Sequence, residues 1–162
     1  MGRRCPETGE YVLYTACLEC DKRSSCGRTP PDKPIFALLV VGTRSFGDYE
    51  FVERKLDSLL VNIRDRYNIL VVSGGAQGVD SLAEAYAKKQ GMEFKKFPAD
   101  FGRYGRSAGY IRNKEMHAFI AKYPHRGCVA FWDGISAGTS HSFDLAKIHK
   151  TQLKVIRIPT RN

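Results

Sequence analysis

Two glycine-rich turns are the residues of this sequence best suited by type and spacing to chemistry. The first turn, residues 73–78 (SGGAQG), ends an apolar run, and the second, residues 134–139 (GISAGT), follows a strand-like run around residues 130–132. Each turn leads into an amphipathic segment, so its backbone N–H groups would meet the positive end of a helix without Cβ obstruction. Together they predict a phosphate site; the alternative is two tight connections that bind nothing.

Charged and polar side chains beside these turns complete the candidate site. Asp80 and Asp133 are the candidates for acid–base roles. The structural alternatives are that Asp80 only stabilises the dipole of the following helix and that Asp133 only forms a turn. Arg44 and Arg112 have the side chain that grips phosphate with two parallel hydrogen bonds. The residues expected to bind a ligand are Gly42, Thr43, Arg44, Ser45, Ser73, Gly74, Gly75, Ala76, Gly78, Arg112, Asn113, Gly134, Gly138 and Thr139.

Some aromatic and histidine side chains near these segments have weaker functional interpretations. Phe46, Tyr104 and Trp132 are candidates to stack a base, although core packing is favoured for Trp132. His141 follows the second turn, and a single histidine in such a place more often has a structural role than a catalytic one.

Four of the five cysteines lie near the N-terminus, at Cys5, Cys17, Cys20 and Cys26. The two-residue spacing between Cys17 and Cys20 suits zinc, and four thiolates complete a tetrahedral site. Disulfides are the alternative, but the first residues lack the apolar stretch of a secretory signal, which favours the reducing cytoplasm. The sequence therefore predicts a structural zinc ion that folds a short N-terminal module.

Composition and charge restrict the function classes. The chain has 162 residues, of which 43% are hydrophobic and 27% charged, and these values fit one globular domain with a small appendage. No apolar run approaches the length of a membrane span, so a cytoplasmic protein without a membrane partner is expected. The net charge of +9 favours a polyanionic partner such as a nucleotide or nucleic acid, although the basic residues are dispersed along the chain.

The pattern along the chain predicts three parts and an α/β fold. Residues 1–27 form the expected zinc module, residues 28–34 a proline-rich linker, and residues 35–162 the main domain. Apolar runs alternate with amphipathic segments in the main domain, which indicates a Rossmann-like, doubly wound parallel sheet of about five strands. The expected strands are residues 35–42, 69–73, 94–98, 128–132 and 153–158. A first helix is expected after a cap at Asp48, with apolar residues at helical spacing from Phe51 to Leu60, and the other helices are expected at residues 79–90, 110–122 and 139–150.

Several unusual segments follow the ends of these strands, and residues 99–109 are expected to be a long glycine-rich loop. In a doubly wound sheet, ligands bind outside the carboxyl ends of the strands, near the switch in strand order. Both glycine turns and this loop should therefore share one rim of the sheet.

Four ordered motifs in the main domain resemble those of the YspA/YpsA-related branch of the SLOG superfamily. They are VVGTRSFGDYE, VVSGGAQGVDSLAEAYA, FPADFGRYGRSAGYIRNKEM and AFWDGISAGTSHSFDLA. The resemblance implies a Rossmann-like fold and a nucleotide or nucleotide-derived ligand. The superfamily includes the cytokinin-activating phosphoribohydrolases and the DNA-processing protein DprA, and it makes a dimer plausible.

One departure bears on the reaction. The phosphoribohydrolases have a catalytic glutamate three residues past the threonine of their second glycine motif, where this chain has Ser142. Asp144 lies two residues further along, about 200° around the helix, so it is not expected to substitute. The resemblance therefore implies a nucleotide ligand without settling whether the chain is an enzyme. A DprA-like protein that binds single-stranded nucleic acid and a ligand-free interaction scaffold are the alternatives.

Overall fold

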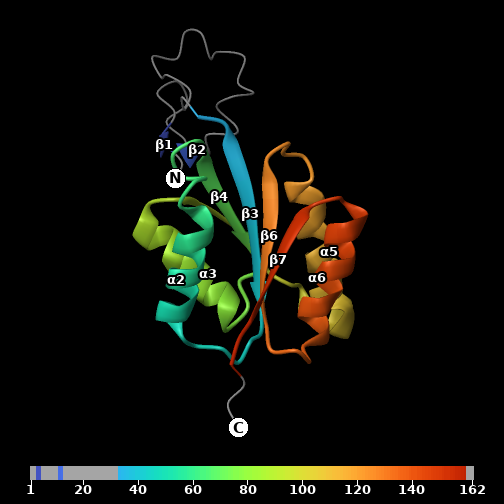
Figure 1. Ribbon diagram of the computed structural model, residues 1–162. Helices are drawn as coiled ribbons and strands as arrows, with labels where there is room; N and C mark the ends of the chain where they lie inside the picture. The colour runs from blue at the N-terminus through green and yellow to red at the C-terminus, as the bar shows by residue number, and fades with distance from the viewer. Residues whose placement is uncertain (1–2, 5–10, 13–32, 160–162) are drawn as a thin grey trace.

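The computed structural model describes residues 3–4, 11–12 and 33–159 of the chain. Its main body is a parallel five-stranded sheet with the strand order β5-β4-β3-β6-β7 (Figure 1). The chain enters at the centre of the sheet, builds one half outward, and then returns to the other side of β3. This is the doubly wound, Rossmann-like arrangement that the sequence predicted. The strands are β3 (Ile35–Gly42), β4 (Asn68–Ser73), β5 (Glu93–Lys96), β6 (Arg126–Trp132) and β7 (Gln152–Arg157).

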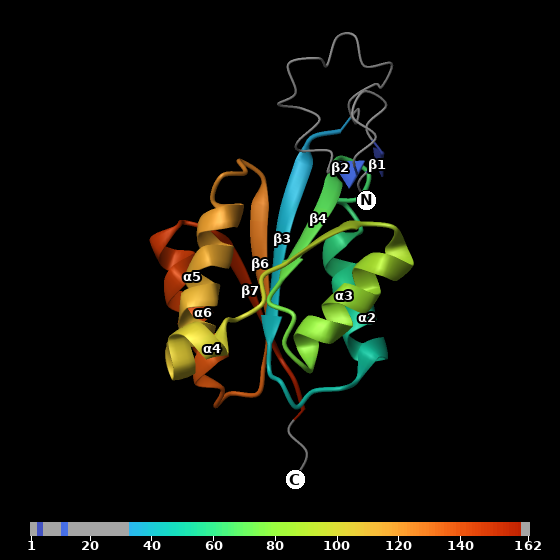
Figure 2. The same cartoon turned by 180° about the vertical axis from the view of Figure 1, so that it is seen from behind.

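Helices cover both faces of the sheet. The pair α2 (Tyr49–Leu60) and α3 (Val79–Gln90) lies on one face, and α5 (Ala108–Ile120) and α6 (Ala137–Ile148) lie on the other (Figures 1 and 2). Because both faces are covered, the central strand β3 is apolar throughout rather than alternating. None of the helices within the described residues is long and apolar enough to cross a membrane.

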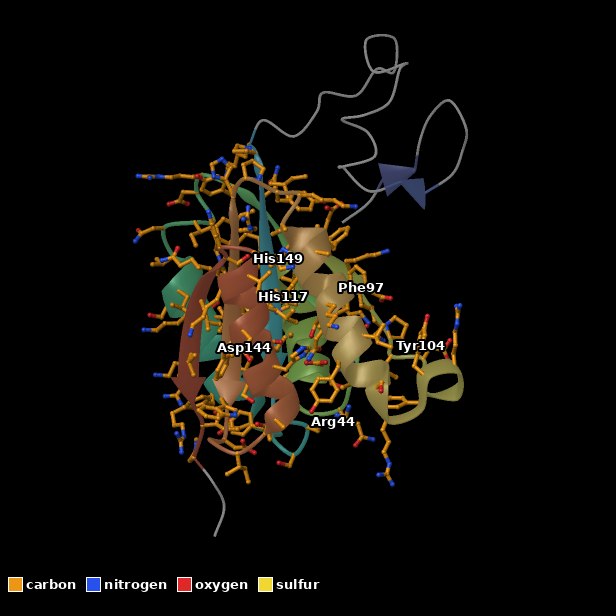
Figure 3. The ribbon with its side chains drawn as sticks, turned by 90° about the vertical axis from the view of Figure 1, so that its right-hand side faces the viewer. Arg44, Phe97, Tyr104, His117, Asp144 and His149 are labelled. Atoms are coloured by element: carbon orange, nitrogen blue, oxygen red, sulfur yellow. The ribbon has the colours of Figure 1, made fainter. Side chains whose placement is uncertain are left out.

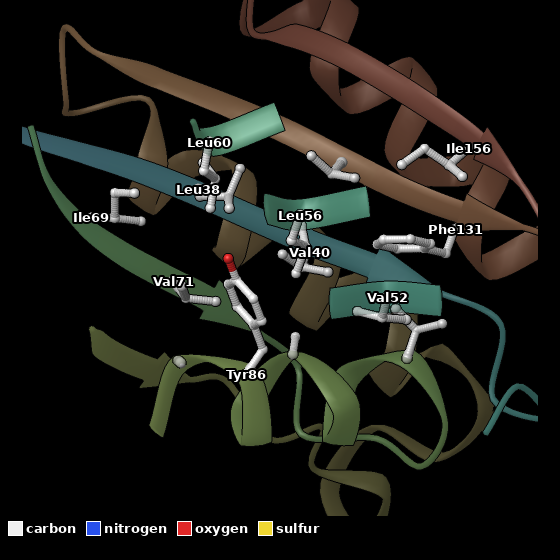
Figure 4. Close-up of a cluster of buried hydrophobic side chains, with 14 of the residues drawn as sticks. Leu38, Val40, Val52, Leu56, Leu60, Ile69, Val71, Tyr86, Phe131 and Ile156 are labelled. Carbon is white, nitrogen blue, oxygen red and sulfur yellow. The ribbon is translucent and has the colours of Figure 1, made fainter. Parts of the chain in front are cut away.

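The core is divided between the two faces. On the α2–α3 face, Val40 packs in one cluster with Leu56 and Tyr86 (Figure 4). On the α5–α6 face, Leu39 packs in a second cluster with Met116 and other apolar side chains. Full burial of one such side chain stabilises the fold by roughly 1.5–3 kcal/mol. These clusters fix the helices against the sheet and so set the positions of their amino ends.

Asp48 begins α2 as predicted, since its Oδ1 accepts a hydrogen bond from the Phe51 N–H at 3.1 Å. Gly91 ends α3 as predicted, with its N–H directed to carbonyls of the last helical turn. At the end of β3, Gly42 lies opposite Phe131 of β6, so the two strands finish at the same level.

The prediction of a loop over residues 99–109 was wrong. This segment contains α4 (Phe101–Tyr104) and the 3₁₀ turn η1 (Gly105–Ser107), which run directly into α5. Asp100 explains the difference, because its Oδ1 accepts from the Arg103 N–H at 3.0 Å and caps α4. Consequently α5 begins earlier than expected. Also, α6 begins at Ala137 rather than at residue 139, and β5 covers residues 93–96 rather than 94–98. The predicted bounds of β3 and α3 are confirmed, and the bounds of β4, β6 and β7 differ slightly from the predicted ones.

At the N-terminus, β1 (Arg3–Arg4) and β2 (Tyr11–Val12) pair antiparallel. The four cysteines of the predicted zinc module, Cys5, Cys17, Cys20 and Cys26, lie outside the described residues. The part of the chain that is described contains no cluster of three or more metal-ligating side chains. The zinc module and the proline-rich boundary after it therefore stay predictions.

Candidate functional site

A cavity of about 580 Å³ lies at the carboxyl ends of β3 and β6, beside the amino ends of α3, α5 and α6. It collects side chains from segments that are far apart in the sequence, at the rim where the doubly wound fold predicts a ligand. Both acid–base candidates, Asp80 and Asp133, line it. The predicted ligand residues that line it are Gly42, Thr43, Arg44, Ser45, Ala76, Arg112, Asn113, Gly138 and Thr139.

The remaining predicted ligand residues do not line this cavity. Ser73 is fully buried and its Oγ donates to the Val40 carbonyl at 2.8 Å, so it joins two strands. Gly78 packs against the backbone of Thr43 and Arg44, and Gly134 lies under the Arg157 side chain. Gly74 and Gly75 line a smaller neighbouring cavity.

Asp80 is a buried carboxyl group in the first turn of α3, with only 4% of its surface exposed. Its Oδ2 accepts a hydrogen bond from the Ala76 N–H at 3.2 Å, which closes the glycine turn. Burial raises the pKa of Asp80 above its ordinary value, and the nearby positive charge of Arg112 opposes that rise only in part. The cavity therefore contains a carboxyl group that retains its proton at a higher pH than a surface aspartate does.

Arg112 is the most deeply buried cation of the site, at 8% exposure. Its Nη1 donates to the Gly74 carbonyl at 3.1 Å, while its buried Nε has no hydrogen-bond partner. Burial lowers the pKa of Arg112, and the charge of Arg44 acts in the same direction, whereas Asp80 opposes the shift. The positive charges of two neighbouring guanidinium groups, Arg44 and Arg112, thus face one cavity and are not fully neutralised by negative groups.

Asp133 has the turn-forming geometry that the sequence gave as its structural alternative. Its Oδ1 accepts from the N–H groups of Ile135 and Ser136 at 2.9 and 2.8 Å. Partial burial acts to raise the pKa of Asp133, but these backbone hydrogen bonds outweigh it and the pKa lies below its ordinary value. This carboxylate holds the loop before α6 and stays ionised.

The amino end of α6 is open to the cavity. Gly138 and Thr139 line it, and the first N–H groups of an α-helix have no partner within the helix. Thr139 does not cap α6: Ser136 occupies the N-cap position without a side-chain cap bond. Asn113 fixes the helix against α5, because its Nδ2 donates to the Gly138 carbonyl at 3.1 Å.

Trp132 has a packing role, as favoured from the sequence. Its Nε1 donates to the Ser136 carbonyl at 3.1 Å, and its ring packs edge-on against Phe143. His141 contacts the Tyr110 ring, with centroids 4.8 Å apart. At the position where the phosphoribohydrolases carry glutamate, Ser142 is fully buried, whereas Asp144 is exposed on α6 (Figure 3). Neither of these two residues lines the cavity.

Several cavity residues were missed by reasoning from the sequence, chiefly on the segment taken for a loop. Phe101 lies on α4, while Gly109 and Tyr110 lie at the start of α5, and Ser136 precedes α6. The cap at Asp100 was the one sequence signal that could have placed the first three. His117 was also missed: it is fully buried between α5 and α6, close to His149 (Figure 3).

Comparison with known proteins identifies relatives of this fold. The model of the YspA, cpYpsA-related SLOG family matches residues 36–104. The Gene 61 protein of Mycobacterium phage D29 is 36% identical over 109 residues, which cover 64% of this chain and 82% of that protein.

A solved structure, described as a predicted subunit of tRNA methyltransferase from Methanocaldococcus jannaschii, is 15% identical to this chain. The match covers 74% of this chain and 67% of that one, with a TM-score of 0.34. The family model covers the part of the chain that builds the first half of the sheet and its glycine turn. The chain belongs to the YspA, cpYpsA-related SLOG family.

Proposed function

We propose that this protein binds a nucleotide or a nucleotide-derived phosphate in the cavity at the carboxyl ends of β3 and β6. The observation that carries the proposal is Arg112, a guanidinium group that is more than nine-tenths buried and has an unpartnered Nε beside the cavity. Burying a charge without full compensation is costly, and an anion that enters the cavity would supply the compensation.

The rest of the cavity suits the same ligand. Arg44 adds a second positive charge, and the free N–H groups at the start of α6 favour a phosphate oxygen. Membership of the SLOG family supports a nucleotide-type molecule as the source of that phosphate.

Asp80 is the group proposed to exchange a proton with the bound molecule. Its raised pKa fits a hydrogen-bond donor or a general acid better than a permanently ionised carboxylate. Asp133 is also a proposed acid–base residue, although both hydrogen bonds at its Oδ1 already serve the loop before α6.

Calorimetric titration of the full chain with AMP tests this proposal. Gly138 is the best position to block the cavity, because a Cβ built there meets no atom within 4 Å and replacement of a helical glycine does not strain the backbone. Gly138→Leu should abolish AMP binding while the unfolding midpoint stays within a few degrees of wild type.

A matched control is Ala85→Leu, which adds the same side chain to the exposed face of α3 away from the cavity. Arg44→Gln should weaken binding about tenfold by removing one charge-assisted contact. Unchanged AMP affinity in Gly138→Leu, or no binding by wild type of AMP, ADP or ribose 5-phosphate, contradicts the proposed site.

The proposal includes a structural zinc ion held by Cys5, Cys17, Cys20 and Cys26. The support is the spacing of the four cysteines, since thiolates at such spacing close a tetrahedral zinc site and leave no position open for catalysis. Metal analysis of the purified full chain should give one zinc per molecule, and Cys20→Ser should reduce it; a metal-free wild type contradicts this part.

A further inference from the structure

A second cavity, of about 320 Å³, adjoins the first. It is lined on one side by the glycine turn after β4 and on the other by Pro98 and Ala99, which follow β5. Four residues line both cavities: Arg44, Ala76, Phe101 and Arg112. The two spaces are therefore neighbours that share one wall, and any ligand of the first cavity meets this wall.

The shared wall carries two positive charges. Within residues 33–159, neither Arg44 nor Arg112 takes part in an ion pair, and the charge of Arg44 acts to lower the pKa of Arg112. Asp80, the carboxyl group whose charge acts on Arg112, is itself held toward its neutral form by burial. Two guanidinium groups at one junction suit a group with more than one negative oxygen placed between them.

The two cavities differ in what they offer on either side of this junction. The larger one has the open start of α6, which suits a phosphate group, and the carboxyl groups of Asp80 and Asp133, which suit sugar hydroxyl groups. The smaller one offers the flat surfaces of the turn backbone, Pro98 and Phe101. Phe101 is 52% exposed, and the Arg44 guanidinium lies over its ring at 5.8 Å from the centroid, so the two side chains together offer an aromatic and cationic surface to a planar group.

We infer that the ligand of this site is a two-part molecule joined through a pyrophosphate, with the bridge between Arg44 and Arg112 and one part in each cavity. The inference rests on the proposed function and narrows its ligand class. A planar base lies in the smaller cavity beside Phe101, and a sugar with its phosphate lies in the larger one. A mononucleotide fills only one of the two spaces and leaves part of the junction uncompensated.

Calorimetric titration of the full chain with ADP-ribose and with its two halves, AMP and ribose 5-phosphate, tests the inference. Wild type should bind ADP-ribose at least tenfold more tightly than either half. Ala99→Trp fills the smaller cavity alone, so it should weaken ADP-ribose binding about tenfold and leave ribose 5-phosphate within twofold. Val61→Trp places the same side chain on an exposed position at the end of α2, outside both cavities, and should change neither affinity.

The outcomes separate the two proposals. If one half binds as tightly as ADP-ribose and Gly138→Leu abolishes that binding, the nucleotide site stands and the two-part ligand is excluded. If Ala99→Trp behaves like Val61→Trp toward ADP-ribose, the smaller cavity is not used and the inference is overturned. Binding of a single-stranded oligonucleotide in preference to all three probes, with a steep salt dependence, also overturns it and favours the DprA-like alternative.

Discussion

The turn after β4 and the turn after β6 look alike in sequence and differ in what their glycines do. In the first turn the glycines allow close packing: Gly78 has φ +77° and a Cβ there would overlap the backbone carbonyl of Arg44. In the second turn the space beside Gly138 is open, and the start of α6 faces the cavity. Similar glycine-rich motifs after a strand thus have different roles: Gly78 allows close packing within the chain, and Gly138 leaves open space beside the cavity.

The difference extends below the turns. The first turn lies over strand residues joined by the Ser73–Val40 hydrogen bond and over the apolar packing of Val79. The second turn is continuous with an α5–α6 interface that buries polar groups without partners, including both ring nitrogens of His117 and the Ser142 hydroxyl. The first turn therefore belongs to the rigid frame of the domain, where a substitution should cost most stability, while the packing beside the second turn should make stability depend on pH.

The largest expected effect is on stability at the first turn. Gly78→Ala forces a Cβ into a positive-φ conformation and onto the Arg44 carbonyl, so it should lower the free energy of unfolding by about 3 kcal/mol or more. Urea denaturation of the purified variant measures this loss. A loss below about 1 kcal/mol would show that the backbone of the turn adjusts to the added Cβ, and it would contradict the difference proposed between the two turns.

Acid should affect the second turn first. Burial and the neighbouring His149 and His141 lower the pKa of His117 from its usual 6.5 to about 4. The unfolded chain therefore takes up this proton before the folded one, and stability present above pH 6.5 is lost as the pH falls through 6.5 toward 4, by at most about 3 kcal/mol.

His117→Leu should remove most of that pH-dependent loss, because the replacement is apolar and of similar size. Urea denaturation between pH 4 and 7 compares the two proteins. The single tryptophan, Trp132, whose indole donates to Ser136 at the second turn, gives a local fluorescence signal. Equal pH dependence in wild type and variant would contradict the assignment to His117.

Ionisation of Asp80, at the start of α3, should change stability with pH in the direction opposite to that of His117. The folded pKa of Asp80 is raised, so its contribution to stability is present at low pH and is lost as the pH rises through that pKa. Asp80→Asn keeps an oxygen for the Ala76 N–H and removes the ionisation. The free energy of unfolding of Asp80→Asn, measured by urea denaturation, should therefore rise relative to that of wild type as the pH increases from 4 to 7. A difference between the two proteins that stays constant over this range would contradict the prediction.

The smallest expected effect is at the open turn. Gly138→Ala should be neutral or should raise the free energy of unfolding by up to about 1 kcal/mol, since alanine favours the helix and meets no atom nearby. Thermal or urea unfolding compares it directly with Gly78→Ala. A loss as large as that of Gly78→Ala would mean that the two glycines have the same role.

The sequence predicted the parts of the molecule that depend on local pattern. The unbroken apolar run at Ile35–Gly42, the cap at Asp48 and the stop at Gly91 each have a physical signature within a few residues. The residues that face the cavity depend instead on how separate elements pack. No local pattern distinguishes the buried Ser73 from the cavity-lining Thr43, because both are small hydroxyl residues that follow an apolar run.

The segment over residues 99–109 shows a second limit. Its glycines outweighed the capping signal of Asp100, so two short helical turns were interpreted as loop and Phe101 was not considered. His117 was missed for a different reason: a buried, unpartnered histidine has no pattern in sequence, because its environment comes from α6 and the residues after it.

The central place of β3 has a consequence for the order of assembly. On one side, β3 pairs with β4, where Leu38 lies opposite Val71, a residue that follows soon after it along the chain. On the other side, β3 pairs with β6, where Leu39 lies opposite Cys128, which is synthesised much later. On the ribosome, the half that contains β3, β4 and β5 can therefore form first, with one edge of β3 unpaired until β6 emerges. The cavity takes walls from both halves and exists only after that late docking, so a ligand should slow hydrogen exchange most strongly in β6.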